Sequence, residues 1–243
     1  MSTSLAIRFP KPTVQAVFKR RYQRFLADMQ LSDGSLITAH TPNTGSMKGC
    51  LVPDSPAILW DSMNPKRKYR YSWKAIKIGR TWVGIDTGLP NELAAEAIRQ
   101  GVIPDWREFT QVEREVPVGT NSRLDLLCRS PNERLYVEVK NVTLVEKGVA
   151  RFPDAPTTRG TKHLRELIRI KASGNRAAML YVVQRSDAQS FEPADDIDPE
   201  YAQTLLSACQ AGVEVVVLSV HITSKGATIR GTLPGNILGK EIS

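Results

Sequence analysis

The sequence predicts a two-domain protein of mixed α and β structure, with a small OB-like β-barrel in residues 1–85 and an α/β domain in residues 86–243. Short strand-like segments separated by Gly, Pro, Asn and Asp fill the first part. Helix-like and strand-like segments alternate in the second part. Basic residues are concentrated in the first part, which indicates that the two parts differ in what they contact.

The first 85 residues have the pattern of a small barrel. The pair Asp33-Gly34 tolerates the backbone angles of a tight turn, so residues 25–31 and 35–39 are expected to form a β-hairpin. Further strands are expected at residues 57–60, 69–78 and 82–85. About five short strands in this length are typical of a barrel such as the OB-like fold.

The remainder is predicted to alternate between helices and strands. A helix is expected over residues 91–100, with Asn91 as its N-cap and Gly101 after its end. Helical spacing of apolar residues indicates two further helices. The later elements are expected to be strands 109–116, 123–128 and 135–139, helix 161–172, strand 177–183, helix 200–211 and strand 213–220. This order is typical of a mixed α/β domain.

The charge is unevenly distributed. Of the 33 Lys and Arg residues 14 precede residue 85, but only 4 of the 25 acids do, so this part carries +10 and the rest −2. A basic region of this kind favours a polyanionic partner, with a solvated basic face as the alternative.

The sequence indicates a cytoplasmic protein that is not inserted in a membrane. The longest apolar stretch, residues 213–220, contains Glu214 and is too short to span a bilayer. The first residues lack the basic and apolar parts of a signal peptide. The three cysteines are far apart and form no CxxC pair, which argues against a disulfide framework or a zinc site.

Two strand-like segments carry the residues best suited to chemistry. Residues 122–127 contain Asp125, and residues 135–140 contain Glu138 and Lys140 among aliphatic neighbours. Buried charges need partners or a metal. In a hairpin the two carboxylates lie at neighbouring positions, and Lys140 projects on the same face as Glu138. They would hold Mg²⁺ or Mn²⁺, which stabilises charge on a phosphodiester while the lysine positions a water. The alternative is a surface hairpin with an ordinary Glu–Lys pair.

An acid followed by Glu-x-Lys on the next strand resembles the catalytic core of the PD-(D/E)XK nucleases. The literal pair Pro104-Asp105 is expected to lie in a loop outside this site. Several segments together resemble the sugar fermentation stimulation protein A family: residues 40–47, 122–125, 138–143, 152–160 and 162–164. That resemblance implies an N-terminal OB-type barrel, a nuclease-fold domain, DNA binding and a regulatory role in sugar (maltose) metabolism.

Four residues near the predicted site are candidates for supporting roles. Glu96 is a candidate third metal ligand, with an exposed helix carboxylate as the alternative. Lys162 and His163 are expected to begin a helix and contact a phosphate, or to form a solvated pair. Arg123 is expected to contact nucleic acid or to pair with an acid across the sheet.

A polar loop and two basic clusters are the nucleic-acid-binding candidates of the first domain. Asn43, Thr44 and Ser46 flank Gly45 in a loop that suits a phosphate or sugar. The alternatives are a self-satisfied tight turn or a contact between the two domains. The basic clusters mix Lys and Arg with aromatic residues, and their candidate phosphate ligands are Lys19, Arg20, Arg21 and Arg24, then Lys66, Arg67, Lys68 and Arg70.

The second cluster is expected to alternate along one strand. Lys68 and Arg70 then share one face with Lys74, and at least two of the three aromatic residues opposite, Tyr69, Tyr71 and Trp73, belong to the core.

Two functions follow from these features. The first is a metal-dependent nuclease, and the second is a non-catalytic DNA-binding regulator. In either case the partner is DNA, with RNA as the alternative. Because no helix-turn-helix or other base-reading motif is present, binding is expected to depend on phosphates rather than on sequence. A sugar- or nucleotide-processing enzyme is a more distant option, since neither a Walker loop nor GxGxxG is found.

Overall fold

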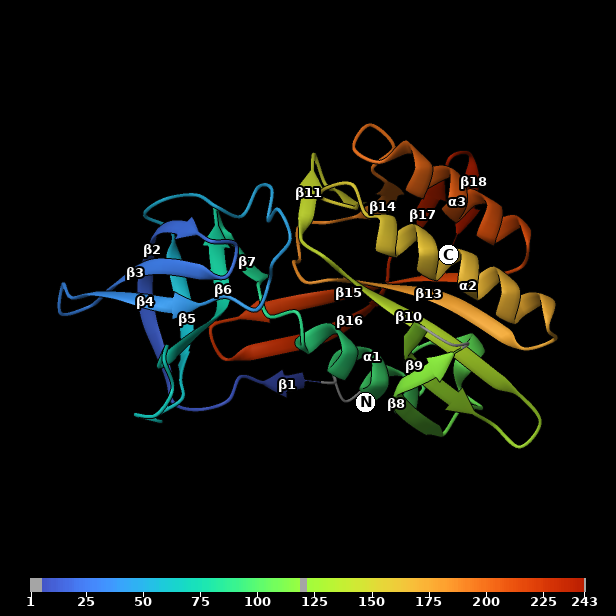
Figure 1. Cartoon of the computed structure of the whole chain (residues 1–243), viewed down its shortest axis with the longest axis horizontal. Helices are drawn as coiled ribbons and strands as arrows, with labels where there is room; N and C mark the ends of the chain where they lie inside the picture. The colour runs from blue at the N-terminus through green and yellow to red at the C-terminus, as the bar shows by residue number, and fades with distance from the viewer. Residues whose placement is uncertain (1–5, 119–121, 243) are drawn as a thin grey trace.

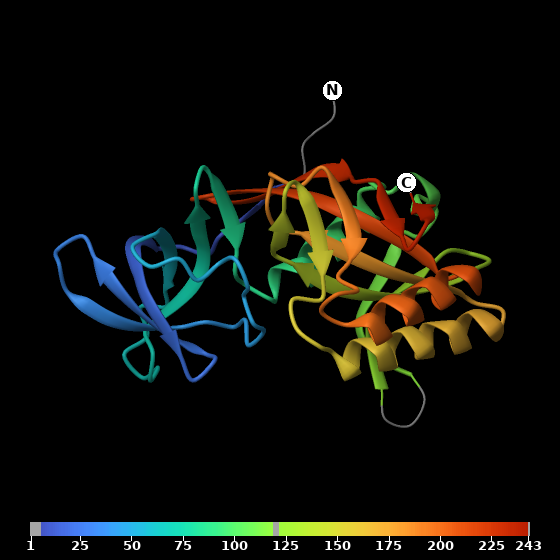
Figure 2. The same ribbon diagram turned by 90° about the horizontal axis from the view of Figure 1, so that it is seen from above.

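The computed structural model describes residues 6–118 and 122–242, which form a barrel lobe and an α/β lobe (Figures 1 and 2). The barrel lobe is a six-stranded sheet in the order β4-β3-β2-β5-β6-β7, and pairing of β4 with β6 closes it. Its strands are β2 (Thr13–Tyr22), β3 (Leu26–Leu31), β4 (Leu36–His40), β5 (Pro56–Asp61), β6 (Tyr71–Ile78) and β7 (Thr81–Gly84). The predicted barrel and its hairpin at Asp33-Gly34 are confirmed.

The α/β lobe is built on a seven-stranded sheet in the order β1-β16-β15-β13-β10-β9-β8. These strands are β1 (Ala6–Arg8), β8 (Gln111–Val118), β9 (Ser122–Arg129), β10 (Arg134–Val142), β13 (Arg176–Val183), β15 (Glu214–Thr223) and β16 (Gly226–Thr232). A smaller sheet contains β11 (Leu144–Glu146), β12 (Val149–Phe152), β14 (Ser190–Pro193), β17 (Gly235–Ile237) and β18 (Lys240–Ile242). The sequence predicts residues 1–85 as the barrel alone, whereas β1 pairs with β16 in the second lobe.

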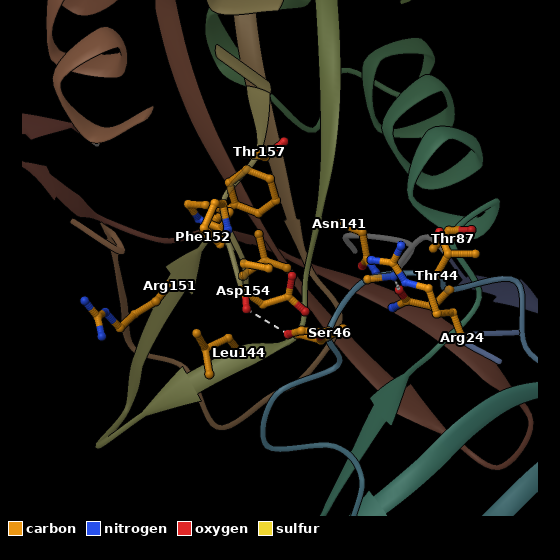
Figure 3. Close-up of a pocket in the computed structure, with 17 residues that line it drawn as sticks. Arg24, Thr44, Ser46, Thr87, Asn141, Leu144, Arg151, Phe152, Asp154 and Thr157 are labelled. Atoms are coloured by element: carbon orange, nitrogen blue, oxygen red, sulfur yellow. Dashed lines mark hydrogen bonds between the residues drawn. The ribbon is translucent and has the colours of Figure 1, made fainter. Parts of the chain in front are cut away.

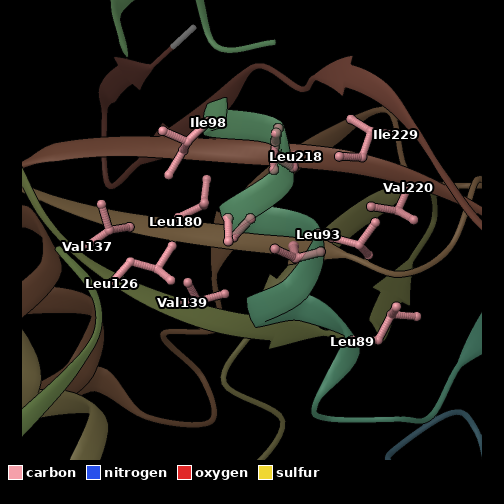
Figure 4. Close-up of a cluster of buried hydrophobic side chains, with 14 of the residues drawn as sticks. Leu89, Leu93, Ile98, Leu126, Val137, Val139, Leu180, Leu218, Val220 and Ile229 are labelled. Atoms are coloured by element: carbon pink, nitrogen blue, oxygen red, sulfur yellow. The ribbon is translucent and has the colours of Figure 1, made fainter. Parts of the chain in front are cut away.

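Helices cover both faces of the large sheet. On one face, α1 (Leu89–Arg99) packs Leu93 and Ile98 against strand residues that include Leu126 and Leu180 (Figure 4). On the other face lie α2 (Thr158–Ala172) and α3 (Pro199–Gln210), with a short 3₁₀ helix at Pro104–Trp106 elsewhere in the lobe. Each fully buried Leu or Ile stabilises the fold by about 1.5–3 kcal/mol. No helix among the described residues is long and apolar enough to cross a membrane.

Two helix starts differ from the prediction. Asn91 is not the N-cap of α1, because the helix begins at Leu89 with Gly88 at the cap position. Pro90 lies in the first turn, where its fixed backbone angle suits a helix and its missing N–H leaves no bond unmade. Helix α2 begins at Thr158, where the Thr157 hydroxyl accepts the Gly160 N–H at 3.0 Å. Lys162 and His163 therefore lie one turn inside α2.

The predicted alternation of the second basic cluster along one strand is also partly wrong. Strand β6 begins at Tyr71, so Lys68 and Arg70 lie in the preceding loop rather than on its face. Two of the aromatic residues do belong to the core, as expected. Trp73 is fully buried and stacks on Phe18 with ring centroids 4.9 Å apart, and Tyr71 packs against the same cluster.

Arg176 and Glu214 form the ion pair that joins the starts of β13 and β15. The guanidinium donates to both carboxylate oxygens at 2.8 and 2.9 Å, and the Trp106 indole N–H donates at 2.7 Å. Burial alone would raise the pKa of Glu214, but the hydrogen bonds from Arg176 and Trp106 outweigh it and lower the pKa. A lowered pKa means that the pair stabilises the folded state at neutral pH.

We expect Glu214→Gln to lower the free energy of unfolding by about 1–3 kcal/mol at pH 7. Because the wild-type contribution is lost as the pH falls through the lowered pKa of Glu214, the difference should shrink below pH 4.5, the ordinary value of this carboxyl. Urea unfolding at several pH values measures it, with the exposed Glu192→Gln as control. An equal difference at pH 7 and pH 3 would contradict the assignment.

Candidate functional site

The centre of the site is the point where β9 and β10 diverge. Their antiparallel pairing ends at Leu126 opposite Val137. Just beyond this pair, the Val139 N–H donates to Oδ2 of Asp125 at 2.8 Å. The Asp125 carboxylate thus satisfies an amide that lies beyond the end of the β9–β10 ladder, and it is held beside Glu138. The structure brings together the predicted residues Asp125, Glu138 and Lys140.

Helix α1 contributes a residue that was not predicted here. The Asn91 side chain donates from Nδ2 to Oδ1 of Asp125 at 2.9 Å. Both Asp125 oxygens are therefore oriented by hydrogen bonds from N–H groups. The sequence signal was available: Asn91 is a polar residue in the first helical turn, but the same residue type at a helix start is usually a cap.

Helix α2 holds Glu138 from the other side. His163 is buried, with 6% of its surface exposed, and its Nδ1 contacts Oε1 of Glu138. Lys140 Nζ contacts the same oxygen and lies 3.4 Å from His163 Nδ1. Arg159 Nε donates to Nε2 of His163 at 3.5 Å, so the proton on Nδ1 is the one that faces Glu138. His163, predicted as a phosphate ligand, instead lies beneath the carboxylate.

The two carboxylates have opposite electrostatic environments. Burial would raise the pKa of Glu138, but hydrogen bonding to His163 and the charge of Lys140 outweigh it and lower the pKa. Burial and the neighbouring Glu138 charge raise the pKa of Asp125. Oε2 of Glu138 is buried and has no hydrogen-bond partner within residues 6–118 and 122–242. A cavity of about 340 Å³ opens onto these groups and is also lined by Asn91 and Arg159.

A hard divalent cation fits this donor set. Such ions accept a small number of carboxylate ligands and keep several waters. The partnerless oxygen of Glu138 and the disfavoured negative charge of Asp125 would both gain from a cation between them. In residues 6–118 and 122–242 no group of three or more Asp, Glu, His or Cys side chains is placed to hold a metal. The protein therefore offers two carboxylates here.

Other predicted site residues are not brought to this cavity. The Glu96 carboxylate bonds to Arg99 and to Gln100 at 2.9 Å, and it lines a different cavity with Arg8 and Arg114. Its helical position, five residues after Asn91, turns it away from Asp125. Arg123 and Lys162 are exposed and are not among the residues that line the cavity at Asp125 and Glu138.

Several predicted phosphate ligands of the barrel are paired with acids. Lys19 pairs with Asp54 at 2.7 Å and Arg20 with Asp28 at 2.7 Å. Arg70 pairs with both carboxylate oxygens of Asp61. These local pairs reduce the charge that the barrel presents to a polyanion.

The remaining residues of the second cluster lie in the loop between β5 and β6. Lys66 and Lys68 are exposed there. Arg67 lies over the Trp60 ring and donates to the Ser72 hydroxyl at 3.1 Å. Lys66 and Lys68 are therefore the members of this cluster best placed to meet a phosphate.

The polar loop of residues 43–46 joins the two lobes. The Ser46 hydroxyl donates to the Asp154 carbonyl at 2.7 Å (Figure 3). The Met47 N–H donates to Oδ2 of Asp154 at 2.8 Å. Within the loop, Oδ1 of Asn43 accepts the Gly45 N–H at 2.9 Å. The expected alternative of a contact between the domains is confirmed.

Comparison with known proteins places this geometry in a family. A model described as "Sugar fermentation stimulation protein RE domain" matches residues 88–226, and one described as "SfsA N-terminal OB domain" matches residues 20–85. The chain belongs to the sugar fermentation stimulation protein family. The predicted family and the predicted fold class, an OB barrel followed by an α/β domain, are therefore confirmed.

Relatives match over nearly their whole length. The sugar fermentation stimulation protein homologue of Geotalea uraniireducens is 48% identical over 227 residues, covering 93% of this chain and 98% of the relative. That of Citrifermentans bemidjiense is 48% identical over 228 residues, covering 94% and 99%. The solved structure of Pyrococcus furiosus SfsA in complex with Ca²⁺ aligns with a TM-score of 0.87 and 28% identity, covering 96% of this chain and 100% of that one.

We expect Asp125→Asn to stabilise the metal-free protein at pH 7, by roughly 0.5–2 kcal/mol. The raised pKa of Asp125 means that its charged form is disfavoured in the folded state, so ionisation above the ordinary value of 3.8 costs stability. The difference in the free energy of unfolding between Asp125→Asn and the wild type should shrink as the pH falls toward 4. Urea unfolding in EDTA measures it, with the exposed Asp105→Asn as control. A loss of stability would mean that the bonds from Asn91 and Val139 outweigh the cost of the charge.

Proposed function

We propose that this protein is a divalent-metal-dependent nuclease that acts on the backbone of DNA, with RNA as the alternative substrate. The observation that carries the proposal is the convergence of Asp125, Glu138 and Lys140 on one cavity, with Oε2 of Glu138 buried and unpartnered. The Ca²⁺ complex of the Pyrococcus furiosus relative supports a divalent cation as the cofactor. Mg²⁺ or Mn²⁺ is the cation expected to support cleavage.

Each side chain of the site would have a separate role in the proposed reaction. Asp125 and Glu138 would hold the cation, which when bound stabilises negative charge on a phosphodiester and makes water more acidic. Asn91 and Val139 fix the orientation of Asp125. His163 keeps Glu138 in place through one carboxylate oxygen, and the second oxygen has no hydrogen-bond partner among the described residues. Lys140 lies at the cavity, where its ammonium group would orient a water or stabilise a phosphate oxygen.

The barrel would supply affinity for the nucleic-acid backbone. The part of the chain before residue 85 carries +10. The exposed Lys66 and Lys68 form no ion pair within the described part of the chain, whereas Lys19, Arg20 and Arg70 are paired with acids. Contacts of this kind are made to phosphates and carry no sequence information. Binding that is largely independent of sequence is therefore expected.

A second candidate is a DNA-binding regulator without cleavage, in line with the sugar-related name of the family. It is favoured by the pairing of Glu138 with both Lys140 and His163, since a carboxylate neutralised from within the protein does not require a metal. The two candidates differ in whether Glu138 is needed for a reaction.

The nuclease proposal predicts that Glu138→Gln loses cleavage by at least about 100-fold. The measurement is cleavage of labelled single- and double-stranded DNA and RNA with Mg²⁺ or Mn²⁺ and with EDTA. Glu133→Gln is the matched control, because Glu133 lies in the turn between β9 and β10 and pairs with Arg176 at the far end of the sheet. Equal background from wild type and Glu138→Gln, with binding retained, would favour the regulator.

The binding role predicts that Lys66→Gln with Lys68→Gln weakens duplex binding about tenfold and lowers the slope of log affinity against log salt by up to about 0.9 per lost phosphate contact. Fluorescence anisotropy over a salt series measures this. Lys225→Gln with Arg230→Gln is the control, since it removes the same net charge from exposed positions in the other lobe. Identical slopes for the two double variants would assign the effect to net charge alone.

A further inference from the structure

A second cavity, of about 370 Å³, lies where the barrel meets the α/β lobe (Figure 3). The barrel contributes Arg24 and the loop of residues 43–46, and the α/β lobe contributes residues 141–144 and 151–157. The two cavities share lining residues: Thr87, Asn141, Phe152 and Thr157. A ligand chain bound at Asp125 and Glu138 would therefore continue into the space between the lobes.

The turn that presents Arg24 is held in an unfavourable backbone conformation. Gln23 and Arg24 have φ angles of 48° and 63°, in the left-handed region that costs energy for residues other than glycine. The half-buried Arg21 maintains it: Nε donates to the Arg24 carbonyl at 2.9 Å, and Nη2 donates to the Asn43 carbonyl at 2.9 Å. Arg21, predicted as a phosphate ligand, instead fixes both barrel segments that line the cavity.

The Arg24 side chain is left available. It is exposed, and the ion pairs found within residues 6–118 and 122–242 do not include it. Figure 3 shows it reaching toward Asn141, with Thr87 nearby and Asp154 apart from them beside Ser46. Oδ1 of Asn141 accepts a bond from Gln184 at 2.8 Å, which leaves its amide N–H groups as donors. An arginine beside an amide donor and a hydroxyl suits a phosphate.

An exposed ring lies next to this arginine. Phe25 follows Arg24 in the same turn and is 41% exposed, and it is the one aromatic residue in the described part of the chain that falls in the exposed range. Exposed rings beside cationic groups are the features that bind unpaired bases by stacking. The cavity is of the size that takes a small ligand, and both lobes enclose it. A base within a duplex would have to leave its pair to enter.

We propose that the cavity between the lobes is a subsite for an unpaired nucleotide next to the phosphodiester that a cation at Asp125 and Glu138 would contact, with Arg24 binding the phosphate of that nucleotide. The subsite rests on the proposed nuclease function for its place in the reaction. It makes the preferred substrate a single strand or an unpaired end.

The test is binding of a labelled 12-nucleotide single-stranded DNA, the same RNA sequence and the blunt DNA duplex, followed by anisotropy over a salt series in EDTA. Arg24→Gln should weaken single-strand binding about tenfold and lower the salt slope by about 0.7, the value for one phosphate contact on a single strand. Duplex binding should change less. The single strand that loses affinity identifies the ligand as DNA or RNA.

The matched control is Arg80→Gln, an exposed arginine in the turn between β6 and β7 of the same lobe and outside the cavity lining. Equal losses for Arg24→Gln and Arg80→Gln, or equal losses on single strand and duplex, would overturn the subsite. Thermal unfolding should be the same for Arg24→Gln and wild type, because the Arg24 side chain is exposed and belongs to none of the ion pairs found.

Failure of the subsite and failure of the nuclease proposal give different results. Binding in EDTA does not require cleavage, so an Arg24 effect without any Glu138-dependent cleavage would retain the subsite in a binding protein. Glu138-dependent cleavage with no single-strand effect of Arg24→Gln would retain the nuclease and remove the subsite.

Discussion

The buried carboxylate of Glu138, on an inner strand of the large sheet, is the constraint on which the rest of the site depends. A charge in this position is costly unless it is paired and hydrogen-bonded. Lys140 and His163 both contact one of its oxygens, and this requires α2 to pack with its second turn against β10. The other oxygen has no partner among the described residues. One carboxylate oxygen is thus held by Lys140 and His163, and the second is the atom that the proposed cation would contact.

The same constraint links the two lobes. Beyond Lys140 the chain of β10 continues through Asn141, whose side chain accepts a hydrogen bond from Gln184, and then through β11 and β12 to Asp154, two residues after the end of β12. Asp154 holds the barrel by accepting the Met47 N–H, while Arg21 ties the two barrel segments on the other side of the cavity. The space between the lobes is therefore bounded by a fixed hydrogen-bonded frame, and the site at Glu138 opens into it.

The sequence predicted what depends on local patterns. Alternation along β9 and β10 was sufficient to place Asp125, Glu138 and Lys140 together, because side chains two apart on a strand share a face. The sequence did not predict that Asn91 contacts Asp125 or that His163 contacts Glu138, because asparagine is common as a helix cap and histidine is common on the surface. Glu96 was misplaced for the related reason that a five-residue offset on a helix changes its face.

Contacts between distant segments could not be read from the sequence. Ser46 and Asp154 are 108 residues apart, and nothing in either segment identifies the other as its partner. The role of Arg21 could not be predicted either, because its acceptors are backbone carbonyl groups, which every residue has. The three-residue strand β1 is too short to show a periodicity, so its pairing in the second lobe was missed.

Destabilising features are not distributed evenly among the cavities of the molecule. They distinguish the two connected cavities at Glu138 and between the lobes from the cavities at Arg8 and at Trp106. The cavity at Arg8 and Arg99 and the one at Trp106 contain acids that bond to neighbouring donors, as Glu96 does to Arg99 and Glu214 to Arg176. The connected cavities between the lobes differ. They contain a carboxylate of raised pKa, a partnerless buried oxygen and an arginine held at positive φ. Each of these features lowers stability. Under the proposed function a cation would relieve the first two and a phosphate would pair with the arginine, and such a concentration of unfavourable features is expected of a binding groove rather than of packing.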